Sequence, residues 1–232
     1  MRQRARSRED KESRREAILE AAREVWATSS FDELTMADVA RRVQLAKGTL
    51  YLYFPTKETL LLALLESALE RCLTEIEHRF SAGDAPDTPD EAALAITAPL
   101  LADEPLTRLL AILGTVLEHN VPQARIRQFK AWLLRRLERT GPCLERRLPF
   151  LGRGGGVRLL VRLHALVAGL AQVARPAPAV ARVLASPGFE PFRIDFDSEL
   201  HAMLAAILRG ESAPVSTRPL SRVDRSRVDR RR

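Results

Sequence analysis

The stretch from Leu34 to Leu64 reads LTMADVARRVQLAKGTLYLYFPTKETLLLAL, and it decides the fold. Thr35 forms a capping pattern ahead of a short helix over 36–43. The next three residues are too few for anything but a tight turn, and a second short helix over 47–54 is stopped by Pro55. Two short helices joined by so brief a turn predict a helix-turn-helix unit.

A third helix precedes this unit, and a long helix follows it. Ser13, with Glu16 three residues later, predicts the start of a helix whose apolar positions recur at helical spacing as far as about Ser29. Thr56 caps a helix with a long, continuous, leucine-rich face. Residues 13–58 therefore predict an N-terminal three-helix domain.

The rest of the chain consists of helical stretches separated by breaks rich in proline and glycine. We expect helices over about 89–101, 105–119, 122–140, 157–174 and 198–209. No alternating β-branched run of convincing length is present, and the abundance of Leu, Ala and Val favours helices packed on helices. The predicted fold is all-α, with the helix-turn-helix domain at 13–58 joined to a larger helical domain at 59–210.

The basic residues in excess are concentrated at the two ends of a chain whose net charge is +7. We expect residues 1–12 to form a flexible basic arm and residues 211–232, with seven basic and three acidic side chains, to form a disordered basic tail. Such ends suit a polyanionic partner, and Arg-rich termini are equally typical of solvated tails. The arginines at positions 2, 4, 6 and 8 could reach a minor groove or add only non-specific attraction.

Catalytic, metal and membrane functions find no support in the sequence. Cys72 and Cys143 are far apart and in no ligand spacing, so neither a disulfide framework nor a zinc site is indicated. No recognisable nucleophile or phosphate loop occurs, and the glycine run at 152–156 lacks the strand and lysine of such a loop. No apolar stretch approaches the roughly 20 residues that span a bilayer. We expect a cytoplasmic protein that is not an enzyme, has no cofactor and does not enter a membrane.

The segment from Leu34 to Leu64 resembles the DNA-binding domain of the TetR family of bacterial repressors. That family's pattern is a Thr-capped helix, a turn, a short helix with a Thr-Leu-Tyr core, and then Phe-x-x-Lys-Glu. The matching positions are Thr35, Ala40, Lys47, Gly48, Thr49, Leu50, Tyr51, Phe54, Lys57 and Glu58. The resemblance is specific over residues 13–65. It implies a sequence-specific transcription regulator, in this case a repressor that a small-molecule effector releases from its operator by tilting the long helix.

The outward face of the second short helix is the expected DNA contact. Leu50 and Phe54 are four residues apart and face the same way, so they are expected to pack inward and leave the other face free. In a major groove Lys47 can donate to guanine, whereas helix ends and lysines can hold phosphates. The predicted DNA-binding residues are Thr35, Ala37, Lys47, Gly48, Thr49, Tyr51, Leu52, Tyr53 and Lys57. For any one of them, a plain cap or a half-buried side chain is the alternative.

The chain departs from the family pattern at three positions. Gln44 stands where glycine is usual, so a residue with a Cβ must adopt the left-handed turn conformation at a cost of roughly 1 kcal/mol. Ala46 replaces the usual capping serine, and Leu52 replaces a common aromatic residue. These changes leave open a helical scaffold protein whose reading head no longer binds DNA. A non-specific architectural DNA binder, driven by the basic ends, is the other alternative.

A single helix-turn-helix reads too few bases, so we expect a homodimer on a pseudo-palindromic operator. The nearly all-apolar stretch 157–174 and the apolar stripe of 198–209 are the candidate interface. In TetR-like proteins the last two helices pair as an intersubunit four-helix bundle, although an ordinary core helix has the same composition. The predicted dimer residues are Leu160, Leu163, Val167, Leu170, Leu200, Met203, Leu204 and Ile207.

Polar and aromatic groups on otherwise apolar helices are the candidates for effector contact. They are His119, Asn120, Gln128, Trp132, His164 and Gln172. A satisfied core histidine is the alternative for His164, and simple packing is the alternative for Trp132. The basic run from Arg125 to Arg139 would suit an anionic effector, and it equally fits a solvated helix face.

Overall fold

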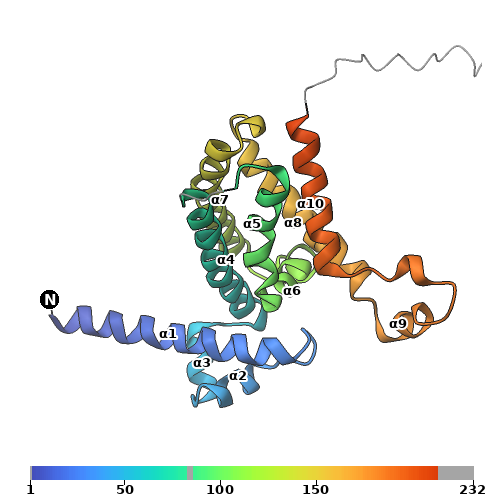
Figure 1. Ribbon diagram of the computed structural model, residues 1–232. Helices are drawn as coiled ribbons and strands as arrows, with labels where there is room; N and C mark the ends of the chain where they lie inside the picture. Colours follow the sequence, from blue (N-terminus) through green and yellow to red (C-terminus); the bar gives the residue numbers. More distant parts are fainter. Residues whose placement is uncertain (1, 83–85, 214–232) are drawn as a thin grey trace, which may run out of the picture.

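The computed structural model describes residues 2–82 and 86–213, and that part of the chain is helical with no β-strand (Figure 1). The predicted all-α class is confirmed. The α-helices are α1 (Arg2–Thr28), α2 (Met36–Arg42), α3 (Lys47–Tyr53), α4 (Lys57–Ser81), α5 (Pro89–Leu101), α6 (Glu104–Ile112), α7 (Gln123–Arg147), α8 (Gly155–Ala174), α9 (Pro178–Leu184) and α10 (Phe196–Ser212). A π-helical turn, η1 (Leu113–Leu117), follows α6, and 3₁₀ turns lie at η2 (Pro149–Leu151) and η3 (Glu190–Phe192).

Helices α1, α2 and α3 form a reading head at one end of the molecule, below the other helices in Figure 1. Ile18 of α1, Leu50 of α3 and Leu60 of α4 are all fully buried. They belong to one continuous apolar core that runs from the head into the helical body. The head is therefore packed against the start of α4 rather than joined to it by a linker.

Side-chain caps fix where several helices of the body begin. Thr56 and Thr59 form a reciprocal capping box at the start of α4, and Thr88 and Glu91 form another at α5. The long α4 contacts α5, α6 and α7, while α8 packs on α6, α7 and α10. These helices enclose the cavity described below.

Helices α7 and α8 touch backbone to backbone near the turn that joins them. A Cβ on Gly156 would lie 2.3 Å from the Gly141 carbonyl oxygen, so only glycine fits there. The sequence had suggested a helix break at Gly141 and Pro142. Instead α7 continues to Arg147 with Pro142 on its exposed side.

Two other predicted boundaries are corrected. Helix α1 begins at Arg2 rather than Ser13, so the segment expected to be a flexible arm is its first part, although the side chains of residues 2–9 are not described. The helix predicted over 105–119 ends at Ile112, where the backbone (φ −101°, ψ 0°) turns into η1. The predicted tail lies outside the described residues from residue 214 onward.

An arm formed by residues 175–195 projects from the body between α8 and α10, at the right of Figure 1. It contains α9 and η3, and neither has a buried residue. The sequence had suggested only a proline-rich break here. The arm presents apolar side chains, among them Val183 and Phe192, which are 53% and 59% exposed.

Candidate functional site

Helix α3 presents one face to the core and the other to solvent. Leu50 is fully buried and Phe54 is 4% exposed, which agrees with the predicted inward packing. On the outer face, Tyr51 is 40% exposed and Leu52 is 83% exposed. The predicted contact residues therefore divide into an exposed group and a half-buried group. Ala37, Lys47, Gly48, Tyr51 and Leu52 are exposed, whereas Thr49 and Tyr53 are half-buried.

The turn between α2 and α3 has the departures that the sequence suggested. Gln44 has φ +56°, and it is the one non-glycine residue with positive φ in the described part of the chain. Ala46 makes no side-chain hydrogen bond to the start of α3. The Lys47 ammonium lies 5.9 Å from the centre of the Tyr51 ring, so these two exposed side chains share one patch.

The two predicted phosphate anchors have partners within the protein. The Thr35 hydroxyl accepts from the backbone N–H of Asp38 and donates to the Asp38 carboxylate at 2.5 Å. This hydrogen bond, with help from Arg41, lowers the pKa of Asp38, so a negative charge already occupies the start of α2. The Lys57 ammonium donates to the Phe31 carbonyl at 2.6 Å and lies over the Phe31 ring. Lys57 thus holds the connection between α1 and α2.

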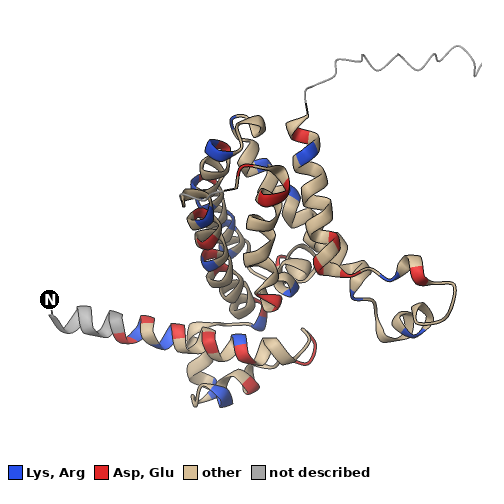
Figure 2. Cartoon of the chain, in the orientation of Figure 1, with Lys and Arg blue, Asp and Glu red and all other residues tan. Residues whose placement is uncertain are grey.

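Arg41 lies beside the predicted DNA-binding residues but is not among them. Its side chain is 78% exposed at the end of α2, next to the turn that leads to α3. Figure 2 shows acidic and basic residues interspersed along α1, α4 and α7. Because opposite charges alternate in this way, the attraction for DNA must come from a few side chains rather than from a broad basic face. In the sequence, the Arg41-Arg42 pair within the Leu34–Leu64 stretch was the available sign of a basic contact at this position.

The reading head is tied to α6 of the body through the end of α1. The indole N–H of Trp26 donates to the Pro105 carbonyl at 2.9 Å. Arg108 donates to the carbonyl oxygens of Trp26 (3.0 Å), Ala27 (3.4 Å) and Ser29, and its guanidinium lies 4.5 Å from the centre of the Trp26 ring. We call this set the α1–α6 clamp.

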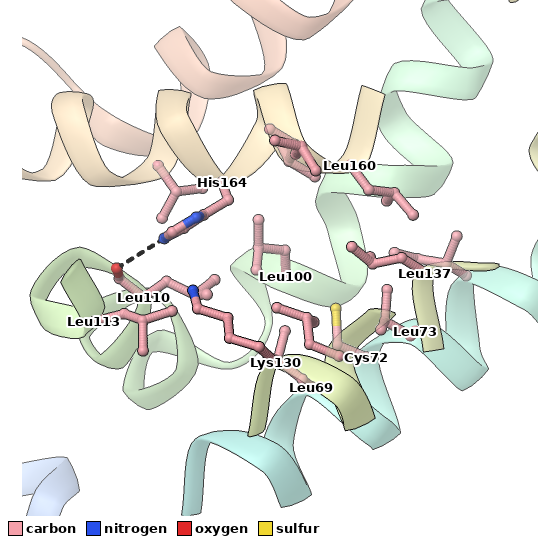
Figure 3. Close-up of a pocket in the computed structure, with 15 residues that line it drawn as sticks. Leu69, Cys72, Leu73, Leu100, Leu110, Leu113, Lys130, Leu137, Leu160 and His164 are labelled. Carbon is pink, nitrogen blue, oxygen red and sulfur yellow. Dashed lines mark hydrogen bonds between the residues drawn. The ribbon is translucent and has the colours of Figure 1, made fainter. Parts of the chain in front are cut away.

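A cavity of about 200 Å³ lies between α4, α6, α7 and α8 (Figure 3). Its lining is mainly leucine, with Cys72, Lys130 and His164 as the side chains that carry polar atoms. The Nε2 atom of His164 lies 3.3 Å from the Leu110 carbonyl oxygen. The cavity can therefore hold a small, mostly apolar molecule.

Of the predicted effector contacts, the structure brings only His164 to this cavity. His119, Asn120, Gln128 and Gln172 are exposed, and Trp132 stacks on Phe129 at 6.1 Å between ring centres. These five residues do not line this cavity, and their contact with an effector stays a prediction. The structure also brings Lys130, a member of the basic run weighed for an anionic effector, to the cavity, with a side chain that is 50% exposed.

Two sequence models of known families match the chain. Residues 18–64 match bacterial regulatory proteins of the tetR family, and residues 66–215 match the tetracyclin repressor-like C-terminal domain. The second match alone covers more than half of the chain. The chain belongs to the TetR family.

Curated HTH-type transcriptional regulators resemble this chain over part of its length. The transcriptional repressor KstR of Mycolicibacterium smegmatis is 35% identical over 78 residues, which are 34% of this chain and 38% of KstR. The uncharacterized regulator YvdT of Bacillus subtilis is 38% identical over 64 residues, 28% of this chain and 33% of YvdT. The chain spans well under half the length of the curated relatives it matches. These relatives are named as transcription regulators, in keeping with the expectation of a non-enzyme.

Solved structures support the TetR fold over most of the chain. A transcriptional regulator from Rhodococcus sp. Rha1 superposes with a TM-score of 0.54 at 21% identity, covering 86% of this chain and 99% of that one. A TetR-family regulator from Syntrophomonas wolfei gives a TM-score of 0.56 at 15% identity, covering 89% and 99%. At such identities the likeness concerns the fold alone.

Most of the residues predicted for a TetR dimer interface are buried inside the protomer. Leu160, Leu163, Val167, Leu170, Leu200 and Leu204 are at most 7% exposed, so their assignment to a partner-facing surface is corrected. Met203 is 38% exposed and Ile207 is half-buried. The outward side of α8 instead presents Val161 and Val173.

Helix α8 is also the one helix in the described residues that is long and apolar enough to cross a membrane, by length and composition alone. From the sequence alone, no apolar stretch of that length was expected. Its buried side packs on α6, α7 and α10, as a core helix does. This packing covers only part of the helix, since 33% of its apolar window is buried.

Proposed function

We propose that the chain is a sequence-specific transcription regulator that binds operator DNA through α3 and acts as a repressor. The observation that carries this proposal is the division of α3 into a buried face, with Leu50, and an exposed face, with Lys47 and Tyr51. A helix held in this way can enter a major groove and present its side chains to base edges. The position of Arg41 beside the turn supports a phosphate contact at the edge of the same groove.

We further propose that the regulator works as a homodimer on a pseudo-palindromic operator. Among the residues whose side chains the structure describes, seven of the eleven exposed large apolar side chains lie on α8, the arm and α10. They are Val161, Val173, Val180, Val183, Phe189, Phe192 and Met203. Such a concentration of exposed apolar surface fits an interface between copies better than a solvated face.

The cavity supports control by a small molecule. It is bordered by α6, and the α1–α6 clamp joins α6 to the reading head. A ligand with different affinities for two positions of α6 would shift the orientation of the head and hence the affinity for DNA. We propose that occupancy of the cavity releases the operator.

Selection of bound duplexes from a random pool, followed by fluorescence anisotropy, tests the DNA proposal. We expect one pseudo-palindromic sequence to be enriched, and Lys47→Ala to weaken binding to it about tenfold or more. Arg127→Ala removes the same charge from an exposed site on α7, outside both proposed interfaces, and should leave the affinity unchanged. Equal affinity for scrambled duplexes across a salt series would contradict sequence-specific binding.

Light scattering after size exclusion tests the dimer face. Met203→Glu places a charge in the proposed interface and should shift the mass toward the monomer. Leu134→Glu makes the same kind of change on α7, where the side chain is 52% exposed, and should leave the mass unaltered. A dimer that tolerates Met203→Glu but not Leu134→Glu would place the interface elsewhere.

A further inference from the structure

The cavity between α4, α6, α7 and α8 has two chemically different ends (Figure 3). His164 and the ammonium of Lys130 lie at one end, beside Leu110 and Leu113. At the other end the figure shows apolar side chains, including those of Leu137 and Leu160. An amphipathic guest would match this division, with its polar group at the first end and its apolar body directed to the second.

The charge at the polar end favours an anion. Lys130 is the only lysine, arginine or carboxylate among the fifteen described residues that line the cavity. Its Nζ contacts Glu118 Oε1 at 2.5 Å, and an ammonium has three donors, so this pair leaves donors for a guest. A cationic guest would face this ammonium, whereas the Glu118 carboxylate that pairs with it lies outside the lining.

His164 has a fixed hydrogen-bonding role at the same end. A carbonyl oxygen can only accept, so the 3.3 Å contact with Leu110 requires that the Nε2 atom of His164 carries the hydrogen. Leu110 lies just before the helix turns into η1, and π-helical turns inside helices are frequent at functional sites. The ring is thus held against α6, where it defines one side of the polar end.

The remaining surface is apolar and chemically inert. Burial, with smaller effects from Asp103 and Glu75, raises the pKa of the Cys72 thiol to about 12, so Cys72 is neutral and acts as apolar surface. An apolar cavity of roughly 150 Å³ accommodates benzene, so about 200 Å³ suits a guest of about eight to ten non-hydrogen atoms.

We propose that the cavity binds an amphipathic monocarboxylate, with its carboxylate at Lys130 beside His164 and a medium-length alkyl chain or a single ring filling the leucine-lined end. The identity of this molecule as the effector rests on the proposed function. Its binding does not, because it can be measured on the full chain without DNA.

Isothermal titration calorimetry with sodium octanoate, sodium hexanoate, 1-octanol and octylamine tests the proposal. Octanoate is expected to bind about tenfold more tightly than 1-octanol, and octylamine least tightly. Each methylene removed from octanoate should weaken binding about fourfold, because about 0.8 kcal/mol accompanies the burial of one methylene. Absence of octanoate binding, or octylamine binding as tight as octanoate, would overturn the proposal.

Two variants separate the effect of the Lys130 charge on binding from any effect on folding. Lys130→Met keeps an apolar stem without the ammonium, and it should abolish the preference for octanoate over 1-octanol while 1-octanol still binds. Arg127→Met makes the same change at an exposed position of α7 and should leave both affinities unaltered. Retained 1-octanol binding shows that the Lys130→Met variant is folded. An undiminished preference of this variant for octanoate over 1-octanol would overturn the proposal. Failure of the Lys47→Ala test on DNA would overturn the regulator function and leave these binding results standing.

Discussion

Arg108→Met would test whether the α1–α6 clamp holds the reading head to the body. The guanidinium donates to three carbonyl oxygens at the end of α1, and it lies 4.5 Å from the centre of the Trp26 ring. Methionine keeps much of the apolar contact with the indole and removes the donors and the charge. The substitution therefore isolates the polar part of the clamp.

The expected loss follows from these contacts. Hydrogen bonds to a charged group contribute about 1.5–3 kcal/mol each, and a cation at a helix C-terminus contributes about 0.3–2 kcal/mol. The three carbonyls lie near the surface and regain water when the guanidinium is removed, so the contributions do not add. We expect the free energy of unfolding to fall by about 2–3 kcal/mol, which corresponds to about 4–12 °C in Tm for a chain of this size.

Urea unfolding followed by circular dichroism, together with operator affinity, measures the effect. Arg162→Met is the matched control because Arg162 pairs with Glu211 at 2.5 Å on an exposed surface, where such a pair contributes about 0–1 kcal/mol. Operator affinity should also fall in Arg108→Met, since the head loses a fixed orientation. A stability within 0.5 kcal/mol of the Arg162→Met variant would refute the idea that the clamp joins the two parts.

Three further predictions concern single positions. Gln44→Gly should raise the free energy of unfolding by up to about 1 kcal/mol, because glycine adopts φ +56° without strain. The control Gln128→Gly, within α7, should lower the free energy of unfolding by about 1 kcal/mol. Thermal melts of the two variants measure these opposite changes. Leu50→Ala should lower the free energy of unfolding, measured in urea, by about 2–5 kcal/mol. Leu52→Ala, at an 83% exposed site, should change the free energy of unfolding by less than 0.5 kcal/mol. Equal losses in the two variants would mean that α3 is oriented differently. At pH 8 a thiol with a pKa of about 12 is ionised in about one molecule in ten thousand. Ellman's reagent should therefore label Cys143 of the native protein and react with Cys72 only in denaturant. Two rapidly reacting thiols in the native protein would show that the cavity wall is open.

The reading head could be predicted from sequence because each of its signals is local. Thr56 caps α4 through neighbouring residues, and the spacing of Leu50 and Phe54 sets which face of α3 is buried. The left-handed turn at Gln44 was expected from the resemblance to the TetR family, in which glycine is usual at this position. Such signals need no knowledge of what the helices pack against.

The buried side of α8 could not be predicted in the same way. Leucines and valines occur almost all round this helix, so periodicity does not distinguish the Leu163 side, which is buried, from the Val161 side, which is exposed. The start of α1 was misplaced because Ser13 and Glu16 have the spacing of a capping box within a continuous helix. Lys130 and His164 come together at the cavity only through the packing of α7 against α8.

The contact between Gly141 and Gly156 determines how the cavity can change size. The backbones of α7 and α8 are in contact at that point, so the two helices cannot come closer there, and no larger residue fits between them. Any widening must then grow with distance from the glycines, toward the beginning of α7 and the end of α8. The first of these is tied to α4 by Arg125 and Glu66, with contacts of 2.9 and 2.6 Å, and the second leads into the arm. A guest molecule that separates α7 from α8 would therefore displace most the beginning of α7, which is tied to α4, and the end of α8, which leads into the arm of the proposed dimer face.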